Sequence, residues 1–147
     1  MTDDVTLGIT IDCTDAPLMA RFWMTALPYV EAAPPAGWES WEAFLAAWDV
    51  PESEWYDGAA IEPANGSGPT ISFLKVPEPK LTKNRVHLDV KVSGGRHVDP
   101  ETRESRIRAK QAELLEAGAT TLTEYPAGDH LDHLVMADPE GNEFCIA

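Results

Sequence analysis

The first part of the chain alternates apolar and polar residues with a period of two. The apolar members of this alternation are Val5, Leu7, Ile9 and Ile11. A period of two is typical of a β-strand that buries one face. The pattern therefore predicts a strand over residues 5–12.

The spacing then changes to that of a helix. Asp15 is a suitable N-cap, and Pro17 fits the first helical turn, where its missing N–H leaves no bond unmade. Apolar residues follow at every third or fourth position until Pro28, which disfavours helix in the residue before it. We therefore predict a helix over residues 16–26.

Residues 31–69 are the least regular part of the chain, with prolines and glycines at both ends. An aromatic stripe at helical spacing lies between them, at Trp38, Trp41, Phe44, Leu45 and Trp48. We predict a helical, Trp-rich insertion over about residues 34–60 that replaces part of the middle strands of its half. Its rings either dock the insertion on the body or line a pocket mouth, where Trp41 and Trp48 are candidates for ligand contact.

The second half of the chain repeats the order of elements in the first. Asp99 and Pro100 begin a predicted helix that ends at Gly118, a good residue for a helix C-terminus. Two fused α+β modules are therefore expected within one domain, over about residues 4–80 and 81–147. The predicted strands around this helix and before it are residues 70–76, 84–92, 120–125, 133–137 and 143–146.

Composition excludes some classes of partner. The net charge of −14 repels nucleic-acid phosphates and anionic membrane surfaces. No apolar stretch approaches a membrane span, and the N-terminus lacks a signal-peptide pattern, so a cytoplasmic protein is expected. Cys13 and Cys145 lie in apolar, strand-like runs without zinc-finger spacing. Two buried, reduced thiols are the favoured interpretation, and a disulfide between them stays open.

Four segments together resemble one known family. They are Thr10–Asp15 with Ala20–Trp23, Lys83–Val90, Gly118–Thr120 and Ala137–Cys145, of which the turn DPEGNEF is the most specific. In this order they are similar to the glyoxalase-like branch of the vicinal-oxygen-chelate superfamily, which includes bleomycin-resistance and extradiol-dioxygenase-like proteins. The resemblance implies two βαβββ modules whose sheets curl into a half-barrel around a cavity. It also leaves a homodimer open.

The resemblance further implies metal ligands on the first and last strands of each module. In the second module these positions correspond to His87 and Glu143. In the first module they correspond to Gly8 or Thr10 and to Ser72, which are poor ligands for a divalent ion. The implied ligand set is therefore incomplete, and a bound Zn, Ni, Mn or Fe ion stays an open alternative.

Other side chains are candidate additions to such a site. Asp12 and Asp89 lie on the same strand faces as Thr10 and His87, so they either complete a carboxylate-rich site or tie the strands to neighbouring loops. His130 and His133 are further candidate donors, in a segment that reads as an exposed loop entering a strand.

Without a metal, a histidine and a carboxylate across a pocket form an acid–base pair. His87 and Glu143 are therefore the predicted catalytic residues, and the alternative is that they only hydrogen-bond each other or water. Ser72, Asp12 and Asp89 are candidate substrate contacts. Arg85 is another, binding an anionic ligand, unless it pairs with a surface carboxylate.

The predicted function is that of a small-molecule-binding protein of this family. A metal-independent or weakly metal-binding enzyme of lyase or isomerase type, acting on a carbonyl-containing or aromatic metabolite, is the preferred hypothesis. A non-catalytic protein that sequesters a drug-like molecule is the first alternative. A metal-dependent lyase, isomerase or dioxygenase is the second. The residues themselves leave open whether turnover occurs.

Overall fold

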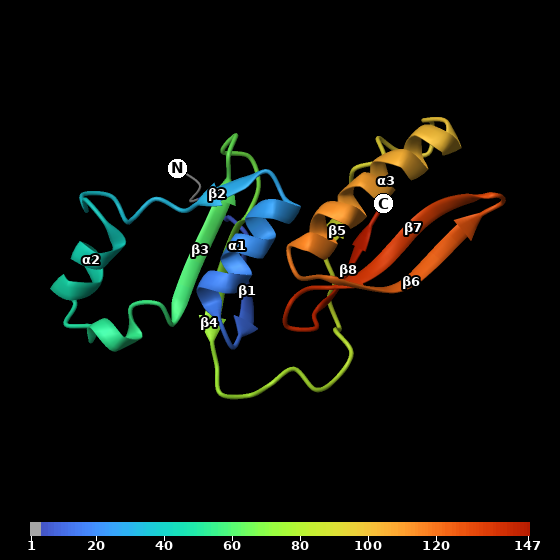
Figure 1. Cartoon of the computed structure of the whole chain (residues 1–147). Helices are drawn as coiled ribbons and strands as arrows, with labels where there is room; N and C mark the ends of the chain where they lie inside the picture. The colour runs from blue at the N-terminus through green and yellow to red at the C-terminus, as the bar shows by residue number, and fades with distance from the viewer. Residues whose placement is uncertain (1–3) are drawn as a thin grey trace. The chain divides into compact units, whose positions relative to one another are not determined.

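The computed structural model of the protein describes residues 4–147, which form two compact units (Figure 1). The first unit contains Pro28–Pro79 and the chain before Thr25; the second contains Thr25–Leu27 and Lys80–Ala147. Each unit has one four-stranded mixed sheet, and the strand orders are β1-β4-β3-β2 and β5-β8-β7-β6. The same strand order occurs in both sheets, which confirms the predicted α+β fold of two βαβββ modules. Neither sheet closes into a barrel.

The strands of the first unit are short and mixed in direction. They are β1 (Gly8–Cys13), β2 (Tyr29–Glu31), β3 (Gly58–Pro63) and β4 (Thr70–Lys75). β1 pairs in parallel with β4, while β3 pairs antiparallel with both β4 and β2. Ile61, Ile71 and Phe73 are fully buried at alternate strand positions, as are Met19 and Trp23 of the helix α1 (Ala16–Ala26).

The predicted helix over residues 16–26 is confirmed, but two expectations for this unit are wrong. The first strand begins at Gly8, and Val5 and Leu7 are exposed. The insertion also replaces no strand, because β2 and β3 lie on either side of it. β3 begins with Gly-Ala-Ala, which lacks the branched side chains of a typical strand. Its pairing with β4, such as Ala60 opposite Ser72, supplies hydrogen bonds that no local pattern reveals.

Between β2 and β3 lies a segment, residues 33–57, that we call the aromatic arm. It contains the helix α2 (Trp41–Ala47) and the 3-10 turn η1 (Glu52–Glu54). Ser40 caps α2 by accepting a hydrogen bond from the backbone N–H of Ala43 at 3.0 Å. The expected short helix is therefore present, but no residue of α2 or η1 is buried. Figure 1 shows α2 standing clear of the sheet of its own unit.

The second unit has a longer hairpin and a longer helix. Its elements are β5 (Asp89–Val90), α3 (Pro100–Glu116), β6 (Thr120–Ala127), β7 (His130–Ala137) and β8 (Glu143–Ile146). α3 contacts β6, β7 and β8. The buried side chains at this contact come from one side of α3 and from alternate positions of β7 and β8; they are Ile107, Leu114, Leu134, Met136, Phe144 and Ile146. We call the opposite face of this sheet, which does not contact α3, the distal face.

The ends of α3 follow the predicted signals. The Asp99 side chain accepts from the backbone N–H of Thr102 at 2.9 Å, and Pro100 is the first helical residue. Gly118 follows the helix with φ of 108°, a conformation that favours glycine. The predicted strand over residues 84–92 is wrong at its ends, because only Asp89 and Val90 form a ladder. No helix among the described residues has the length and apolar character needed to cross a membrane.

Candidate functional site

The distal face of the second sheet gathers three reactive side chains. β5 and β8 run parallel with Asp89 opposite Cys145, and His87 precedes Asp89 by two residues and points to the same side. His87 Nε2 lies 3.4 Å from Asp89 Oδ1. One ligand atom from each of His87, Asp89 and Cys145 lies within 4.8 Å of the others. Sequence reasoning named the first two residues and did not place the cysteine in the site.

Cys145 carries a neutral thiol in this arrangement. Its side chain is half-buried and forms no disulfide. Burial raises the pKa of the thiol, and the charge of Asp89 and a hydrogen bond to Asp89 raise it further. The S–H group is therefore a donor to the Asp89 carboxylate and a poor nucleophile at neutral pH. Asp89 consequently contacts both the imidazole and the thiol.

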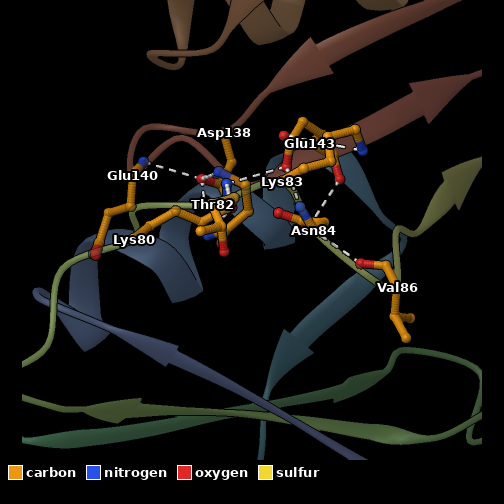
Figure 2. Close-up of polar contacts among 9 residues, drawn as sticks. Lys80, Thr82, Lys83, Asn84, Val86, Asp138, Glu140 and Glu143 are labelled. Carbon is orange, nitrogen blue, oxygen red and sulfur yellow. Dashed lines mark hydrogen bonds and ion pairs between the residues drawn. The ribbon is translucent and has the colours of Figure 1, made fainter.

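Glu143 lies at the start of β8 and is held by the segment that precedes β5 (Figure 2). Its Oε2 accepts the backbone N–H of Asn84 at 3.1 Å and lies 3.2 Å from Lys80 Nζ, while its Oε1 lies 3.9 Å from Lys83 Nζ. Burial acts to raise the pKa of Glu143, but hydrogen bonds from its own backbone and from Asn84, together with Lys80, outweigh it and lower the pKa. Within residues 4–147, Glu143 has no hydrogen bond or ion pair with His87.

Asn84 strengthens this attachment through its side chain. Its Nδ2 donates to the carbonyl of Val86 at 3.1 Å and to the carbonyl of Glu143 at 3.3 Å, as Figure 2 shows. The Glu143 and Asn84 side chains therefore attach the segment before His87 to the first residue of β8 by hydrogen bonds. Residues 84–88 are thus attached to β8 although they form no regular strand. This attachment also limits the positions that the His87 backbone can take.

The other predicted site residues lie in different surroundings. Asp12 is exposed and Ser72 half-buried, on the face of the first sheet opposite to Ile71 and Phe73. In the aromatic arm, the indole N–H of Trp41 donates to the carbonyl of Ala32 at 2.8 Å, and Trp48 is 69% exposed. Arg85 is exposed and has no ion pair in the described part of the chain. The pairing of Arg85 with a surface carboxylate, which the sequence left open, is thus absent.

A second histidine–carboxylate pair occurs on the hairpin of the same sheet. His133 Nδ1 lies 2.8 Å from Oδ2 of the buried Asp132. Asp132 also accepts hydrogen bonds from Arg96 at 2.8 and 3.1 Å and lies 3.4 Å from Arg103. These contacts lower the pKa of Asp132, and the hydrogen bond with His133 is the largest cause. The His133 ring stacks on Tyr125 with centroids 4.6 Å apart. The alternation along β7 was the signal that could have identified this histidine as facing away from α3.

The residues around His87 fit a divalent metal in their chemistry. A catalytic zinc site uses three protein ligands and keeps one position open. Ligands at about 2.0–2.3 Å from one ion lie about 3–4 Å from each other, which is compatible with three donor atoms within 4.8 Å. Imidazole and thiolate favour zinc over manganese. Cys145 would have to lose its proton on metal binding, since its pKa is raised.

Comparisons with known proteins agree with this fold. A family model described as a glyoxalase-like domain matches residues 8–147. The structure resembles a glyoxalase/bleomycin resistance protein/dioxygenase family enzyme from Burkholderia phytofirmans PsJN, with 15% identity, 94% and 93% of the two chains covered and a TM-score of 0.57. It also resembles the fosfomycin resistance protein FosX from Mesorhizobium loti, with 10% identity, 99% and 91% coverage and a TM-score of 0.60.

A third similar structure was solved with a metal ion. It is a mutant of FosX from Listeria monocytogenes complexed with Mn(II) and 1S,2S-dihydroxypropylphosphonic acid, with 11% identity, 99% and 90% coverage and a TM-score of 0.58. At these identities the likeness shows the fold alone. No protein among the curated sequences matches the chain.

Proposed function

Because the chain belongs to the glyoxalase-like domain family, we propose that it is an enzyme acting on a small carbonyl-containing compound at the distal face of its second sheet. The observation that supports this proposal is the contact of His87 with Asp89, 3.4 Å apart, beside the Cys145 thiol. A histidine oriented by a carboxylate is the usual arrangement of an enzymatic acid–base group. The first sheet offers no such pair, since the chain has no histidine before His87.

The proposed reaction is a proton transfer next to a carbonyl group. Asp89 contacts Nε2 of His87, so Nδ1 is the nitrogen that takes a proton from the substrate carbon. The electron pair of the broken C–H bond forms an enolate, and the Asp89 carboxylate stabilises the imidazolium. Return of the proton to a neighbouring atom gives an isomer, so the step needs no oxidant or reductant. Proton transfer by a positioned side chain contributes about 10²–10⁴-fold to a rate.

Glu143 has a positioning role in this proposal. Its lowered pKa and its contacts with Lys80 and Asn84 make it a weak base at neutral pH. It holds the segment before His87 against β8, so it acts on the reaction through the placement of the imidazole. Arg85, exposed next to this segment, is the proposed contact for an anionic group of the substrate.

The test uses exchange of substrate protons with solvent deuterium. A panel of α-hydroxyketones and α-ketoaldehydes is incubated with the protein in D₂O, and loss of the α-proton signal is followed by NMR. We expect exchange above the buffer rate for at least one compound, about 100-fold slower with His87→Ala. Val86→Ala, at an exposed neighbouring residue, serves as the matched control and keeps the rate. Equal exchange by the wild type and His87→Ala would refute the proposal.

A metal-dependent form of the same enzyme is the second candidate, favoured by the grouping of His87, Asp89 and Cys145. These three residues would hold a divalent ion, which would polarise the substrate carbonyl. We expect Zn²⁺ to raise the melting temperature more than Mn²⁺, Ni²⁺ or Fe²⁺, and the increase to vanish in His87→Ala and in Cys145→Ser. A melting temperature that no ion changes would leave the metal-free form as the proposal.

A further inference from the structure

The aromatic arm concentrates exposed aromatic surface. Four of the five tryptophans of the chain lie between residues 38 and 55. Phe44 is the centre of the cluster: its ring centroid lies 5.6 Å from that of Trp38 and 6.1 Å from those of Trp41 and Trp48. Trp48 is 69% exposed and Tyr56, further along the arm, 64%. The rings thus pack on each other and leave much of their surface accessible.

The same region lacks positive charge. Between Arg21 and Lys75 the sequence contains neither lysine nor arginine, whereas it contains eight carboxylates: Glu31, Glu39, Glu42, Asp49, Glu52, Glu54, Asp57 and Glu62. Lys75 lies 3.5 Å from Asp57. In the described part of the chain, Glu39, Glu42, Asp49, Glu52 and Glu54 have no cationic partner. The arm therefore has an uncompensated negative potential around its aromatic rings.

Hydrogen bonds within the arm and to its neighbours hold two of its indole rings and the ends of its helix in place. The indole N–H groups of Trp41 and Trp55 donate to the backbone carbonyls of Ala32 and Val50, at 2.8 and 2.9 Å. Ser40 caps the helix, and the backbone N–H of Val50 donates to the carbonyl of Leu45 at 3.0 Å to close its other end. The backbone that carries the rings and the Trp41 ring itself are therefore held before a ligand binds, which lowers the entropic cost of binding.

We propose that the aromatic arm is a binding site for a small organic cation of the alkylated ammonium class. The negative face of an aromatic ring attracts such a cation, and tryptophan attracts it most strongly. The surrounding carboxylates add a long-range attraction, and the net charge of −14 extends it over the whole chain. This site consists of other residues than the His87 site, and the proposal does not depend on the proposed function.

The charge pattern distinguishes a cation from other occupants. A neutral apolar ligand would use the rings but gain nothing from the carboxylates. A second copy of the chain would bring another net charge of −14 against the arm. An anionic ligand would be repelled. An alkylated ammonium ion is favoured by both features, and its weak hydration allows close contact with the rings.

The experiment compares choline with its neutral isostere 3,3-dimethylbutan-1-ol, which has the same shape but carbon in place of the charged nitrogen. Tryptophan fluorescence reports on the arm, because four of the five tryptophans lie in it and a ligand cannot contact the ring of the fifth, Trp23, which is buried. We expect a saturable fluorescence change with choline, and binding of the neutral isostere at least about fivefold weaker. The difference in affinity between choline and the neutral isostere should decrease in high salt, since salt screens the attraction of the carboxylates for the cation.

Variants locate the site. Trp48→Leu keeps an apolar side chain but removes the ring, so we expect about fivefold weaker choline binding, with partial recovery in Trp48→Phe. Glu42→Gln tests the charge and should weaken binding about twofold. Tyr125→Leu removes an exposed aromatic ring of the other unit and should leave choline binding unchanged. Because Trp48 is exposed, its variants should keep the wild-type melting temperature.

Three results would overturn this proposal. The first is equal binding of choline and the neutral isostere, which would make the arm a purely apolar surface. The second is unchanged choline binding in Trp48→Leu. The third is a dimer in solution that dissociates in Trp48→Leu, which would show that a second copy covers the rings.

Discussion

The two units have the same strand order, but they differ in the chemistry of their side chains. Nine of the eleven lysines and arginines and all four histidines lie from Lys80 onward. In the second unit these cations hold carboxylates in place: Arg96 and Arg103 contact Asp132, and Lys80 contacts Glu143. In the first unit most carboxylates of the aromatic arm have no ion-pair partner among residues 4–147. Duplication thus preserved the topology, whereas ordered polar networks and candidate proton-transfer groups occur in the second unit.

The largest effect is expected from Asp132→Asn in the second unit. Asp132 is buried and contacts Arg96, Arg103 and His133, so its neutralisation leaves cations without their partner. We expect a loss of about 3 kcal/mol in the free energy of unfolding, measured by urea denaturation. Asp57→Asn in the first unit is the matched control, because its contact with Lys75 is solvent-exposed and should contribute less than about 1 kcal/mol. Equal losses in both variants would contradict the contrast between the units.

A second prediction concerns Glu143→Gln. The amide cannot replace the ion pair with Lys80 and offers one acceptor oxygen where the carboxylate has two, so the free energy of unfolding should fall by about 1–2 kcal/mol. Proton exchange with the responsive substrate should also slow about tenfold at temperatures where the variant is fully folded, because His87 is less well positioned. Glu116→Gln, at an exposed position in α3, is the control for both measurements. A normal exchange rate in Glu143→Gln would remove its positioning role.

The stability of the protein should decrease in acid, because protonation removes the contacts that the Asp132 and Glu143 carboxylates make. Asp132 and Glu143 have pKa values below their ordinary 3.8 and 4.5 in the folded state. A carboxyl group whose pKa is lowered on folding stabilises the native state above its unfolded pKa, and this contribution is lost as pH falls through the folded pKa. We therefore expect the melting temperature to fall below about pH 4.5, with a shallower decline in Asp132→Asn. An equally steep decline in that variant would argue against this origin.

The reactivity of Cys145 gives a smaller effect that tests the distal face. Burial and Asp89 raise the pKa of its thiol, so iodoacetamide should alkylate it slowly at pH 8. Asp89→Asn removes one cause of the raised pKa, and we expect alkylation to become about threefold to tenfold faster, followed by mass spectrometry. Cys13, which is buried in the first unit, should stay unreactive in both proteins. An unchanged alkylation rate in Asp89→Asn would show that Asp89 does not raise the pKa of the Cys145 thiol.

The smallest effect is expected from Arg85→Gln. Arg85 is exposed and has no ion pair in residues 4–147, so the free energy of unfolding should change by less than about 0.5 kcal/mol. If Arg85 contacts an anionic group of the substrate, the variant raises KM and leaves kcat unchanged. A large loss of stability would show that Arg85 has a structural partner.

Local patterns determined much of the fold. Helix α1 and both ends of α3 follow from spacing, capping residues and proline, because these signals act within a few residues of each other. The repeated order of elements predicted two modules, and the family resemblance implied their βαβββ arrangement, which the matching strand orders confirm. The aromatic stripe predicted α2, although not that its rings would pack mainly on one another.

Contacts between distant segments were decided only by the tertiary structure. β2 and β3 exist because neighbouring strands complete their hydrogen bonds, which no short window of sequence contains. The sequence predicted His87 as a site residue and put Asp89 on the same strand face, but only the register of β5 and β8 brings Cys145 to them. Likewise, only the folded chain places Lys80 and Asn84 against Glu143. Side-chain identity can be read from the sequence, whereas a partner across a sheet depends on strand register and on charges far away along the chain.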